Sequence, residues 1–370
     1  MNIMLQGYLC DANFGDVLFA HLFYKRCLEA GFQDVDFFQF RGYGIGAVCR
    51  KELGYTRQKS LWSCFCADAF VLISGGSFWN DSRIENDAKI RFRRFILPAL
   101  IYQFLGKPVC ILGVGGGPVD TIWLRKMMVK LLNKAKTVYF RDELTNQIFS
   151  DYGVKNKTLV TADTALVLKP DMLEAFEKKD ELEKISAGRK KLLFHIPDGK
   201  VANQYVADIV TPGLIPFLKE HKEYLLVLSN DNIRDIGSEE KGYIENIRKS
   251  LNDNGIEFYD YIYHSCWQMC SLINEMDCLV TSKLHVGVVG AALGKSVVAF
   301  PIHREKTDEF YKMIGESDRC INLRNLNSNT VYGQMNKFHD KQIHISDELR
   351  MKAEMNLKVI DDIANKKNAS

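Results

Sequence analysis

The sequence lacks the features that mark membrane-spanning, secreted or nucleic-acid-binding proteins. No apolar run reaches the roughly 20 residues that an α-helix needs to cross a bilayer. The N-terminus, MNIMLQGYLC, has no basic segment followed by a long apolar stretch, so it does not have the pattern of a signal peptide. The net charge is only +3 over 370 residues, and no long block of one sign stands out. We therefore expect a cytoplasmic protein with no nucleic-acid partner.

Three common catalytic and metal-binding motifs are also missing. The ten cysteines stand singly within apolar runs, and Cys64-x-Cys66 and Cys266-x3-Cys270 lack the CxxC pairs of a zinc site. There is no GxGxxG fingerprint for a dinucleotide and no GxSxG nucleophile elbow. The sequence therefore predicts buried free thiols, no metal and no cofactor, and it argues against a serine hydrolase.

What the chain does contain is a regular alternation of strand and helix patterns. Short apolar runs typical of buried strands alternate with segments whose apolar residues recur at helical spacing, which predicts a doubly wound α/β fold. The alternation stops at Glu174–Lys184, where nearly every residue is charged. We therefore predict two Rossmann-like domains facing a cleft, the architecture called GT-B in sugar transferases. The predicted parts are an N-terminal domain over 1–170, a charged linker over 171–190, a second domain over 191–330 and a C-terminal segment over 331–370 with a terminal helix.

One stretch, Asp277–Ile302, predicts a complete βαβ unit. Cys278–Thr281 has the pattern of a buried strand, Val286–Leu293 that of a helix rich in small residues, and Val297–Phe300 that of a second strand. The turn between the first strand and the helix carries Lys283 and His285. This turn lies at the carboxyl end of the strand, and open α/β sheets bind ligands at the edge where their strands have their carboxyl ends. The free N–H groups at the start of a helix favour anions. The turn is either a reaction centre or the site of a structural histidine that caps or packs the helix.

Three turns of the predicted N-terminal domain carry further candidates. Asn13 and Asp16 follow the first strand, and each is either a ligand contact or an N-cap. Two later strands end in glycine clusters, which predict either backbone crowding around a shared crevice or close turn packing. The cluster glycines singled out are Gly75, Gly76, Gly115 and Gly116.

Arg141 stands where a helix begins, and a cation is unfavourable there because the helix dipole places partial positive charge at that end. It therefore needs a partner, either an anionic ligand or a carboxylate such as Asp142 or Asp163. A second basic cluster, Arg91, Arg93 and Arg94, precedes an apolar helix. It predicts either peripheral contact with a membrane surface or a solvated face leading into a core helix, and we favour the solvated face.

Several motifs occur together in one order. They are GYLCDANFGD, ISGGSFWND, GVGGGP, VYFRDELT, TADTAL, DCLVTSKLH and GKSVVAFP, followed by Lys306. In this order and spacing the chain, from about Gly7 to Lys306, resembles the polysaccharide pyruvyl transferase family. The resemblance implies a GT-B-like fold and transfer of pyruvate from phosphoenolpyruvate to two hydroxyls of a sugar, as a cyclic ketal, in surface polysaccharide (exopolysaccharide) biosynthesis. The implied partners are phosphoenolpyruvate as co-substrate and a sugar or lipid-linked glycan as acceptor.

The resemblance also implies roles for individual residues. The family's segment usually reads Arg-x-His, so His285 is the implied general acid, and Lys283 stands where an arginine is usual. Lysine still provides a charge for phosphate but not the bidentate fork of arginine. Arg141 and Lys306 are the next candidates for anion contacts. Asp16 and Asp163 are candidate sugar ligands or bases on the acceptor side, which is the N-terminal domain, or else caps. The donor side is the second domain.

Two other functions fit the same pattern of domains. A glycosyltransferase using a nucleotide sugar would hold a diphosphate at the Lys283 turn and needs a ribose-binding glutamate nearby, for which Glu305 and Glu309 are present. A non-catalytic sugar-binding relative would account for the loss of the usual arginine at position 283. We place pyruvyl transfer first and nucleotide-sugar transfer second.

Overall fold

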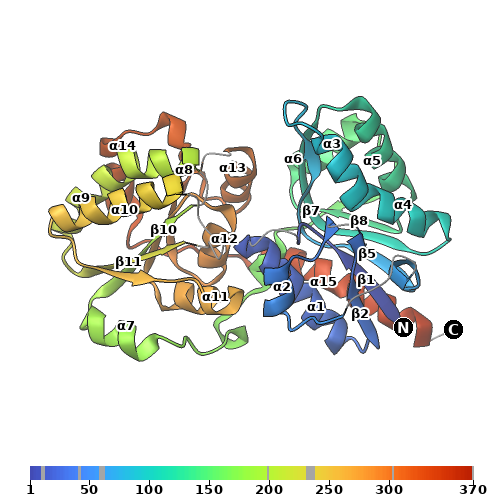
Figure 1. Ribbon diagram of the computed structural model, residues 1–370, viewed down its shortest axis with the longest axis horizontal. Helices are drawn as coiled ribbons and strands as arrows, with labels where there is room; N and C mark the ends of the chain where they lie inside the picture. Colours follow the sequence, from blue (N-terminus) through green and yellow to red (C-terminus); the bar gives the residue numbers. More distant parts are fainter. Residues whose placement is uncertain are drawn as a thin grey trace. The chain divides into compact units, whose positions relative to one another are not determined.

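The computed structural model describes residues 1–9, 13–40, 43–57, 63–197, 200–230, 238–301 and 304–368 (Figure 1). The chain forms two compact units, the first made of residues 1–167 and 346–370 and the second of residues 168–345. Each unit is a parallel sheet between helices, as the alternating pattern predicts. No described helix is both long enough and apolar enough to cross a membrane.

The units divide the chain differently from the predicted domains in two places. The charged stretch 171–190 belongs to the second unit and contains a helix, α7 (Lys179–Ser186). The C-terminal stretch 331–370 is shared, because α14 (Ser328–Phe338) is part of the second unit whereas α15 (Asp347–Asn368) packs on the first. Helix α14 is absent from the sequence-based prediction.

The main sheet of the first unit has the strand order β2-β1-β5-β7-β8-β9, and all its pairings are parallel. The chain leaves β1 for β2 on one side and then crosses to β5 on the other, so β1 and β5 flank a topological switch point. A short antiparallel pair, β3 (Gln39–Phe40) and β4 (Tyr43–Gly44), stands apart. The sheet strands are β1 (Asn2–Gln6), β2 (Asp34–Phe37), β5 (Ala69–Leu72), β7 (Val109–Val119), β8 (Thr137–Phe140) and β9 (Thr158–Val160).

The two glycine clusters form strands, so their interpretation as turns is wrong. Gly75 and Gly76 open β6 (Gly75–Asn80), which pairs in parallel with the second half of β7, where Gly115 and Gly116 lie. A Cβ on Gly116 would collide with the carbonyl oxygen of Phe78 on β6. Gly116 is therefore required by close packing of two backbones, which was the structural alternative for this cluster.

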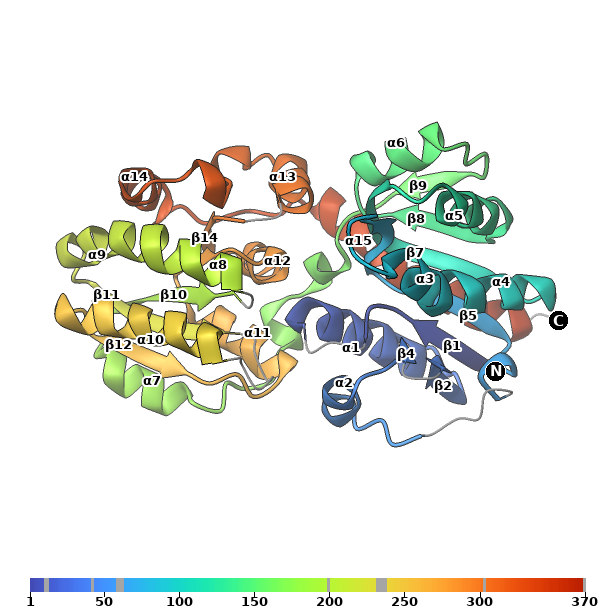
Figure 2. The same cartoon turned by 45° about the horizontal axis from the view of Figure 1, so that its top comes forward.

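Helices cover both faces of the first sheet (Figure 2). Helix α1 (Phe14–Glu29) packs with α15, and α15 also contacts β7. The other face carries α4 (Leu97–Phe104), α5 (Ile122–Lys134) and α6 (Glu143–Asp151), which share one apolar core with the strands. Two shorter helices, α2 (Ala47–Glu52) and α3 (Asp87–Arg91), complete the unit.

A π-helical segment, Phe92–Ile96, joins α3 to α4 and is explained by Pro98. Proline has no N–H, so the carbonyl of Arg94, four residues earlier, loses its helical donor. The side chain of Gln6, the last residue of β1, replaces that donor with a hydrogen bond of 2.7 Å from Nε2 to the Arg94 oxygen. The end of β1 is thereby tied to the helix of the opposite crossover.

The sheet of the second unit has the order β12-β11-β10-β13-β14, again entirely parallel. Its switch point lies between β10 and β13, because the chain builds outward from β10 in both directions. Helices α8, α9, α10 and α14 share a core on one face, and α11 and α12 pack together elsewhere on the unit. The elements are β10 (Lys190–Ile196), β11 (Tyr224–Asn230), β12 (Phe258–Tyr261), β13 (Cys278–Thr281), β14 (Ser296–Ala299), α8 (Lys200–Tyr205), α9 (Thr211–Glu220), α10 (Ser238–Asp253), α11 (Cys266–Glu275), α12 (Leu284–Ala292) and α13 (Arg304–Met313).

The βαβ unit predicted around Asp277–Ile302 is present, with β13 at the predicted residues and Gly294 in the left-handed conformation (φ +71°) after the helix. Helix α12 begins at Leu284 rather than Val286. This shift places Lys283 at the N-cap and His285 in the first turn.

Substitution of Gly213 tests the packing of α14 on α9. A Cβ at Gly213 would collide with the carbonyl oxygen of Ser328 and lie 2.6 Å from Cβ of Val331. We expect Gly213→Ala to destabilise the second unit by about 1–3 kcal/mol, the usual effect of overpacking. Urea unfolding followed by circular dichroism measures this change.

Gly333, also on α14, is the matched control, because nothing lies within 4 Å of the position of its Cβ. Gly333→Ala should stabilise the protein by about 0.5–1 kcal/mol through helix propensity. Equal effects of the two substitutions would contradict the packing argument.

Candidate functional site

The carboxyl ends of β10 and β13 bring a histidine and a threonine together at the switch point of the second sheet. His195 and Thr281 are register partners on the two strands, and both are buried. Thr281 Oγ1 lies 3.4 Å from Nδ1 of His195 and accepts a hydrogen bond of 3.0 Å from the backbone N–H of Lys283. Thr281 therefore fixes the backbone of the following turn against the neighbouring strand.

That turn presents Lys283 and His285 at the start of α12. Lys283 is the N-cap, with extended backbone angles (φ −99°, ψ 131°), and both side chains are half-buried. Between Thr281 and Lys283, the hydroxyl of Ser282 is buried and makes no hydrogen bond within the described part of the chain. The first N–H groups of a helix lack intrahelical acceptors and the dipole is positive there, so the turn is suited to an anion. The structure thus gathers a cation, an imidazole and a hydroxyl around one anion-favouring helix start.

Small residues and a buried tyrosine hold α12 in this position. A Cβ on Gly287 would lie 2.6 Å from the hydroxyl oxygen of Tyr311, which comes from α13 and is fully buried. Burial raises the pKa of Tyr311 above its ordinary value, so the phenol stays neutral. Lys306 is half-buried on the same helix α13, which packs against α12, so Lys306 belongs to the unit that holds Lys283 and His285.

The switch point of the first sheet brings Asp16 close to Gly75. Asp16 lies in the first turn of α1, is 8% exposed, and its Oδ1 is 3.3 Å from the position that a Cβ on Gly75 would take. Asn13 caps the same helix, because its Oδ1 accepts a hydrogen bond of 3.0 Å from the N–H of Gly15. The capping interpretation is therefore correct for Asn13, whereas Asp16 is a buried carboxylate at the edge where ligands of such sheets bind.

Arg141 lies between two carboxylates, as the sequence-based alternative proposed. It is 4% exposed, its Nη1 is 3.5 Å from Oδ2 of Asp163 and its Nε is 3.4 Å from Oδ2 of Asp142. Gly115 makes room for the guanidinium, since a Cβ there would lie 2.8 Å from Cζ. The Nη2 atom of Arg141 is buried without a hydrogen-bond partner among the described residues.

Both carboxylates also cap backbone. Asp142 is the N-cap of α6 and accepts from the N–H of Thr145 at 2.8 Å, and Asp163 accepts from the N–H of Ala165 at 3.0 Å. Arg141, Asp142 and Asp163 therefore form a buried cluster that holds two loops at the carboxyl edge of the first sheet.

A polar network around Gly113 was not identified from the sequence. Gly113 has φ +64°, and a Cβ there would collide with side chains from three other segments. Ser74 Oγ lies 2.6 Å from Thr164 Oγ1, and Asn356 Nδ2 of α15 donates to the same oxygen at 2.9 Å. The network ties the C-terminal helix to the edge of the first sheet.

The predicted site residues thus fall into two groups. Asn13, Asp16, Gly75, Gly76, Gly115, Gly116, Arg141 and Asp163 lie in the first unit, and Lys283, His285 and Lys306 lie in the second. Glu309 lies on α13, whereas the side chain of Glu305 lies outside the described residues. Four of the residues that sequence reasoning missed share one signal, a polar residue at or near the end of an apolar strand: Gln6, Ser74, His195 and Thr281. No group of three or more His, Cys, Asp or Glu in the described ranges could hold a metal ion.

The family model for "Polysaccharide pyruvyl transferase" matches residues 13–304. The match covers more than half of the chain and confirms the resemblance drawn from the motifs. No curated protein matches the chain in sequence.

Solved structures with similar folds include complexes with UDP and with UDP-GlcNAc. The S. aureus MnaA–UDP co-structure has a TM-score of 0.62 at 9% identity, covering 100% of this chain and 97% of that one. UDP-GlcNAc 2-epimerase from Neisseria meningitidis, bound to UDP-GlcNAc, gives 0.61 at 12% identity, with 99% and 100% covered. Anabaena Alr3699/HepE in complex with UDP gives 0.53 at 14% identity, with both chains fully covered. At these identities the likeness shows the fold alone, and it confirms the predicted GT-B-like α/β class.

Substitution of Arg141 should have a large effect on stability, and this effect should not be additive with substitution of its partner Asp163. Arg141→Met would leave two buried carboxylates without their cation, so we expect a loss of about 3–5 kcal/mol in the free energy of unfolding. Adding Asp163→Asn should restore part of that loss, because one of the two uncompensated charges is removed. Chemical denaturation of the single and double variants measures the coupling, and strictly additive losses would contradict the pairing.

Proposed function

Because the chain belongs to the polysaccharide pyruvyl transferase family, we propose that it transfers the pyruvyl unit of phosphoenolpyruvate to two hydroxyls of one sugar. The product is a cyclic ketal, and inorganic phosphate is released. The observation that supports this reaction most directly is the Lys283–His285 turn. It combines a cation, a proton donor and a helix start at the switch point of the second sheet.

In this proposal the donor binds at the start of α12. The phosphate and carboxylate of phosphoenolpyruvate are both anionic, and the N–H groups of the first helical turn together with Lys283 offset that charge. Lys306 on the adjacent α13 provides a second cation within the same unit. The hydrogen bond from Lys283 N–H to Thr281 fixes the turn, so the donor meets a preorganised site.

His285 is the proposed general acid. It gives a proton to the methylene carbon of phosphoenolpyruvate, which becomes the methyl group, and positive charge develops at the neighbouring carbon. The oxygen of the first sugar hydroxyl bonds to that carbon, the phosphate leaves, and the second hydroxyl oxygen takes its place. Of the two hydroxyl protons, one restores the acid and the other leaves with phosphate, so the reaction is balanced. An imidazole suits this role because it exchanges protons near neutral pH.

The sugar acceptor is assigned to the first unit, where Asp16 is the candidate base or hydroxyl ligand. Its carboxylate is buried beside the backbone of Gly75, at the carboxyl edge of the sheet. Carboxylates bind pairs of sugar hydroxyls by accepting two hydrogen bonds. Arg141 and Asp163 support this edge through their ion pair. The acceptor is a sugar carrying two suitably placed hydroxyls, either free or on a lipid-linked glycan.

A glycosyltransferase reaction remains the second candidate, and the ligands of the named structures of similar fold support the nucleotide-sugar donor that it needs. Two of them contain UDP and one contains UDP-GlcNAc. A diphosphate would use the same helix start as phosphoenolpyruvate. The two candidates therefore differ in the ligand that the second unit takes.

Ligand-induced stabilisation separates these candidates. A ligand that binds only the folded protein raises the free energy of unfolding by about 2.7 kcal/mol at 100 times its Kd. We expect phosphoenolpyruvate to raise the thermal midpoint, Lys283→Ala to remove most of that rise, and Lys283→Arg to keep or increase it. The measurement is a thermal-shift titration with phosphoenolpyruvate, UDP-glucose and UDP-GlcNAc in parallel. Stabilisation by a UDP-sugar alone would replace pyruvyl transfer with the second candidate.

The role of His285 predicts loss of turnover without loss of folding. General acid catalysis contributes about 10²- to 10⁴-fold, so His285→Ala should lower kcat by that factor. The unfolding free energy should change by no more than about 1 kcal/mol, because the residue is half-buried on the first turn of α12. Phosphate release from phosphoenolpyruvate with a sugar acceptor is the assay.

His264→Ala is the matched control, since His264 is an exposed histidine outside the turn. It should leave both kcat and stability unchanged. If His285→Ala instead loses stability in proportion to activity, the histidine is structural and the acid must be sought elsewhere.

A further inference from the structure

Two neighbouring helices of the first unit expose large apolar side chains to solvent. Ile122 and Trp123, which open α5, are 64% and 43% exposed, and Phe104 and Leu105 at the end of α4 are 88% and 49% exposed. The helices lie side by side (Figures 1 and 2). The start of α5 touches the π-helical segment before α4 through the rings of Trp123 and Phe92, and α4 itself touches α5 through a hydrogen bond of 2.9 Å from Gln103 Nε2 to the Leu131 oxygen. Ile122 and Trp123 therefore lie at one end of the helix pair, beside Phe92, and Phe104 and Leu105 lie at the other end.

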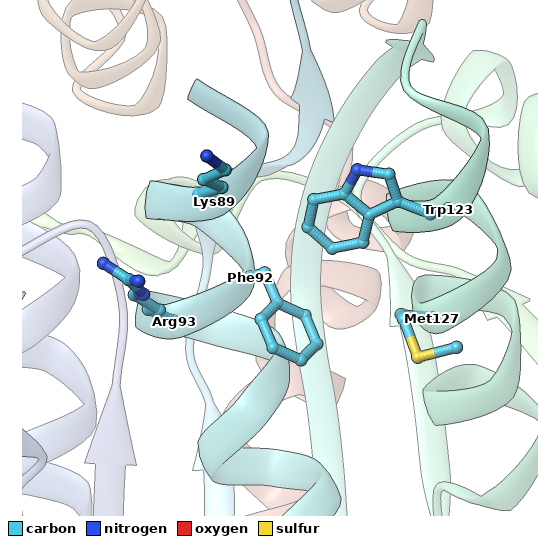
Figure 3. Close-up of a pocket in the computed structure, with 5 residues that line it drawn as sticks. All are labelled: Lys89, Phe92, Arg93, Trp123 and Met127. Atoms are coloured by element: carbon cyan, nitrogen blue, oxygen red, sulfur yellow. The ribbon is translucent and has the colours of Figure 1, made fainter. Parts of the chain in front are cut away.

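A pocket of about 480 Å³ lies between the segment that precedes α4 and the start of α5 (Figure 3). Phe92, Trp123 and Met127 form its apolar lining, and Lys89 of α3 and Arg93 of the π-helical segment complete it. The ring of Phe92 meets that of Trp123 edge-on, with centroids 5.5 Å apart and an interplanar angle of 75°. This contact holds the indole in place while leaving much of it exposed.

The charge of this region is strongly one-sided. From Ala88 to Arg141 the sequence contains eleven lysines and arginines but only one acidic residue, Asp120, whereas the whole chain has 49 basic and 46 acidic residues. Some of the basic groups have internal partners, such as Arg91, which pairs with Asp87. Five exposed ones lie on α5 or just before α4: Lys126, Lys130 and Lys134 on α5, Lys89 on α3 and Arg93 in the π-helical segment.

The helical spacing places these charges beside the apolar groups. On α5, Lys126 and Lys130 lie three and seven residues after Trp123, so they share its face. We define the α4–α5 surface as the exposed residues Lys89, Arg93, Phe104, Leu105, Ile122, Trp123, Lys126, Lys130 and Lys134, together with the pocket.

We propose that the α4–α5 surface binds a bilayer of anionic phospholipid. Headgroup phosphates match the lysines and Arg93, and Trp123 with its aliphatic neighbours matches the acyl boundary below them. Nucleic acid offers phosphates but no apolar layer for Ile122 and Phe104. A protein partner would need a face that is both acidic and apolar. An anionic bilayer presents both properties as a layer, so it is the occupant that we propose.

The structure shows which arginines of the sequence cluster are exposed for contact with a membrane. Of the cluster Arg91, Arg93 and Arg94, Arg91 is buried against Asp87, and Arg94 is half-buried over the ring of Tyr8. Arg93 alone among the three is exposed. The membrane-facing charge therefore comes mainly from the lysines of α5, which the sequence-based interpretation did not single out.

The test is flotation of the full chain with vesicles of pure phosphatidylcholine or of phosphatidylcholine with roughly 30% phosphatidylglycerol. We expect binding to the anionic vesicles only, and release as salt shortens the Debye length below its value of about 10 Å at 0.1 M. Each lysine near such a surface contributes about fivefold in affinity. Lys126→Glu with Lys130→Glu should therefore weaken binding at least about 25-fold.

The matched control places the same charge reversals at Lys184 and Lys249, two exposed lysines of the second unit. Both double variants change the net charge equally, so a general electrostatic attraction would be weakened equally by the two. Equal loss of binding would overturn the proposal, as would equal binding to both kinds of vesicle.

The apolar half of the contact has its own readout. Brominated acyl chains should quench tryptophan fluorescence on binding, and Trp123→Phe should remove most of that quenching while leaving the thermal midpoint unchanged. Persistence of the quenching in Trp123→Phe would overturn the assigned orientation. Sedimentation velocity without lipid tests a competing occupant, and a dimer that dissociates in Ile122→Ser would make the surface a protein interface and refute the lipid assignment. These results do not depend on pyruvyl transfer.

Discussion

The candidate chemistry of this protein depends on where the hydrogen-bonded ladders of its parallel sheets stop. Along a parallel strand the backbone groups are satisfied by neighbours and the side chains are buried on both faces, so polar groups have little place there. The ladder stops at the carboxyl end of the strand, where the chain turns into a helix with free N–H groups. Polar side chains at this end can find hydrogen-bond partners. Thr281, Lys283 and His285 follow one such end, and Asp16 and Gly75 flank another.

Both sheets add a topological reason for a site at one particular position. Between β1 and β5, and between β10 and β13, the following connections leave in opposite directions, so no crossover helix covers the gap between the strand ends. The polar side chains nearest these gaps are held by specific contacts rather than by exposure to water. Thr281 fixes the turn of Lys283, and Gln6 completes the π-helical segment before α4.

The first unit carries two chemically different surfaces on its single sheet. Its carboxyl edge is lined by buried ionic groups such as Arg141 and Asp163, which are held in place by neighbouring backbone. The α4–α5 surface on one face is basic and apolar, and its lysines point to solvent. A polar edge suits a sugar, whereas a basic and apolar face suits a lipid headgroup layer. An acceptor sugar attached to a lipid would match both, with the sugar at the polar edge and the lipid layer at the α4–α5 surface.

The sequence alone determined the βαβ unit around Lys283, because buried strands are short apolar runs and a small-residue helix closed by Gly294 has few other arrangements. It also determined the family, whose motifs lie in turns and strand ends. It could not assign the two glycine clusters to strands, since glycine has no side chain to reveal a pleat and only the contact with Phe78 explains Gly116. Nor could it place Asn356, which lies 192 residues from Thr164 along the chain yet donates a hydrogen bond to it. Such contacts depend on which helix returns to which sheet, and that is decided by the packing of the whole unit.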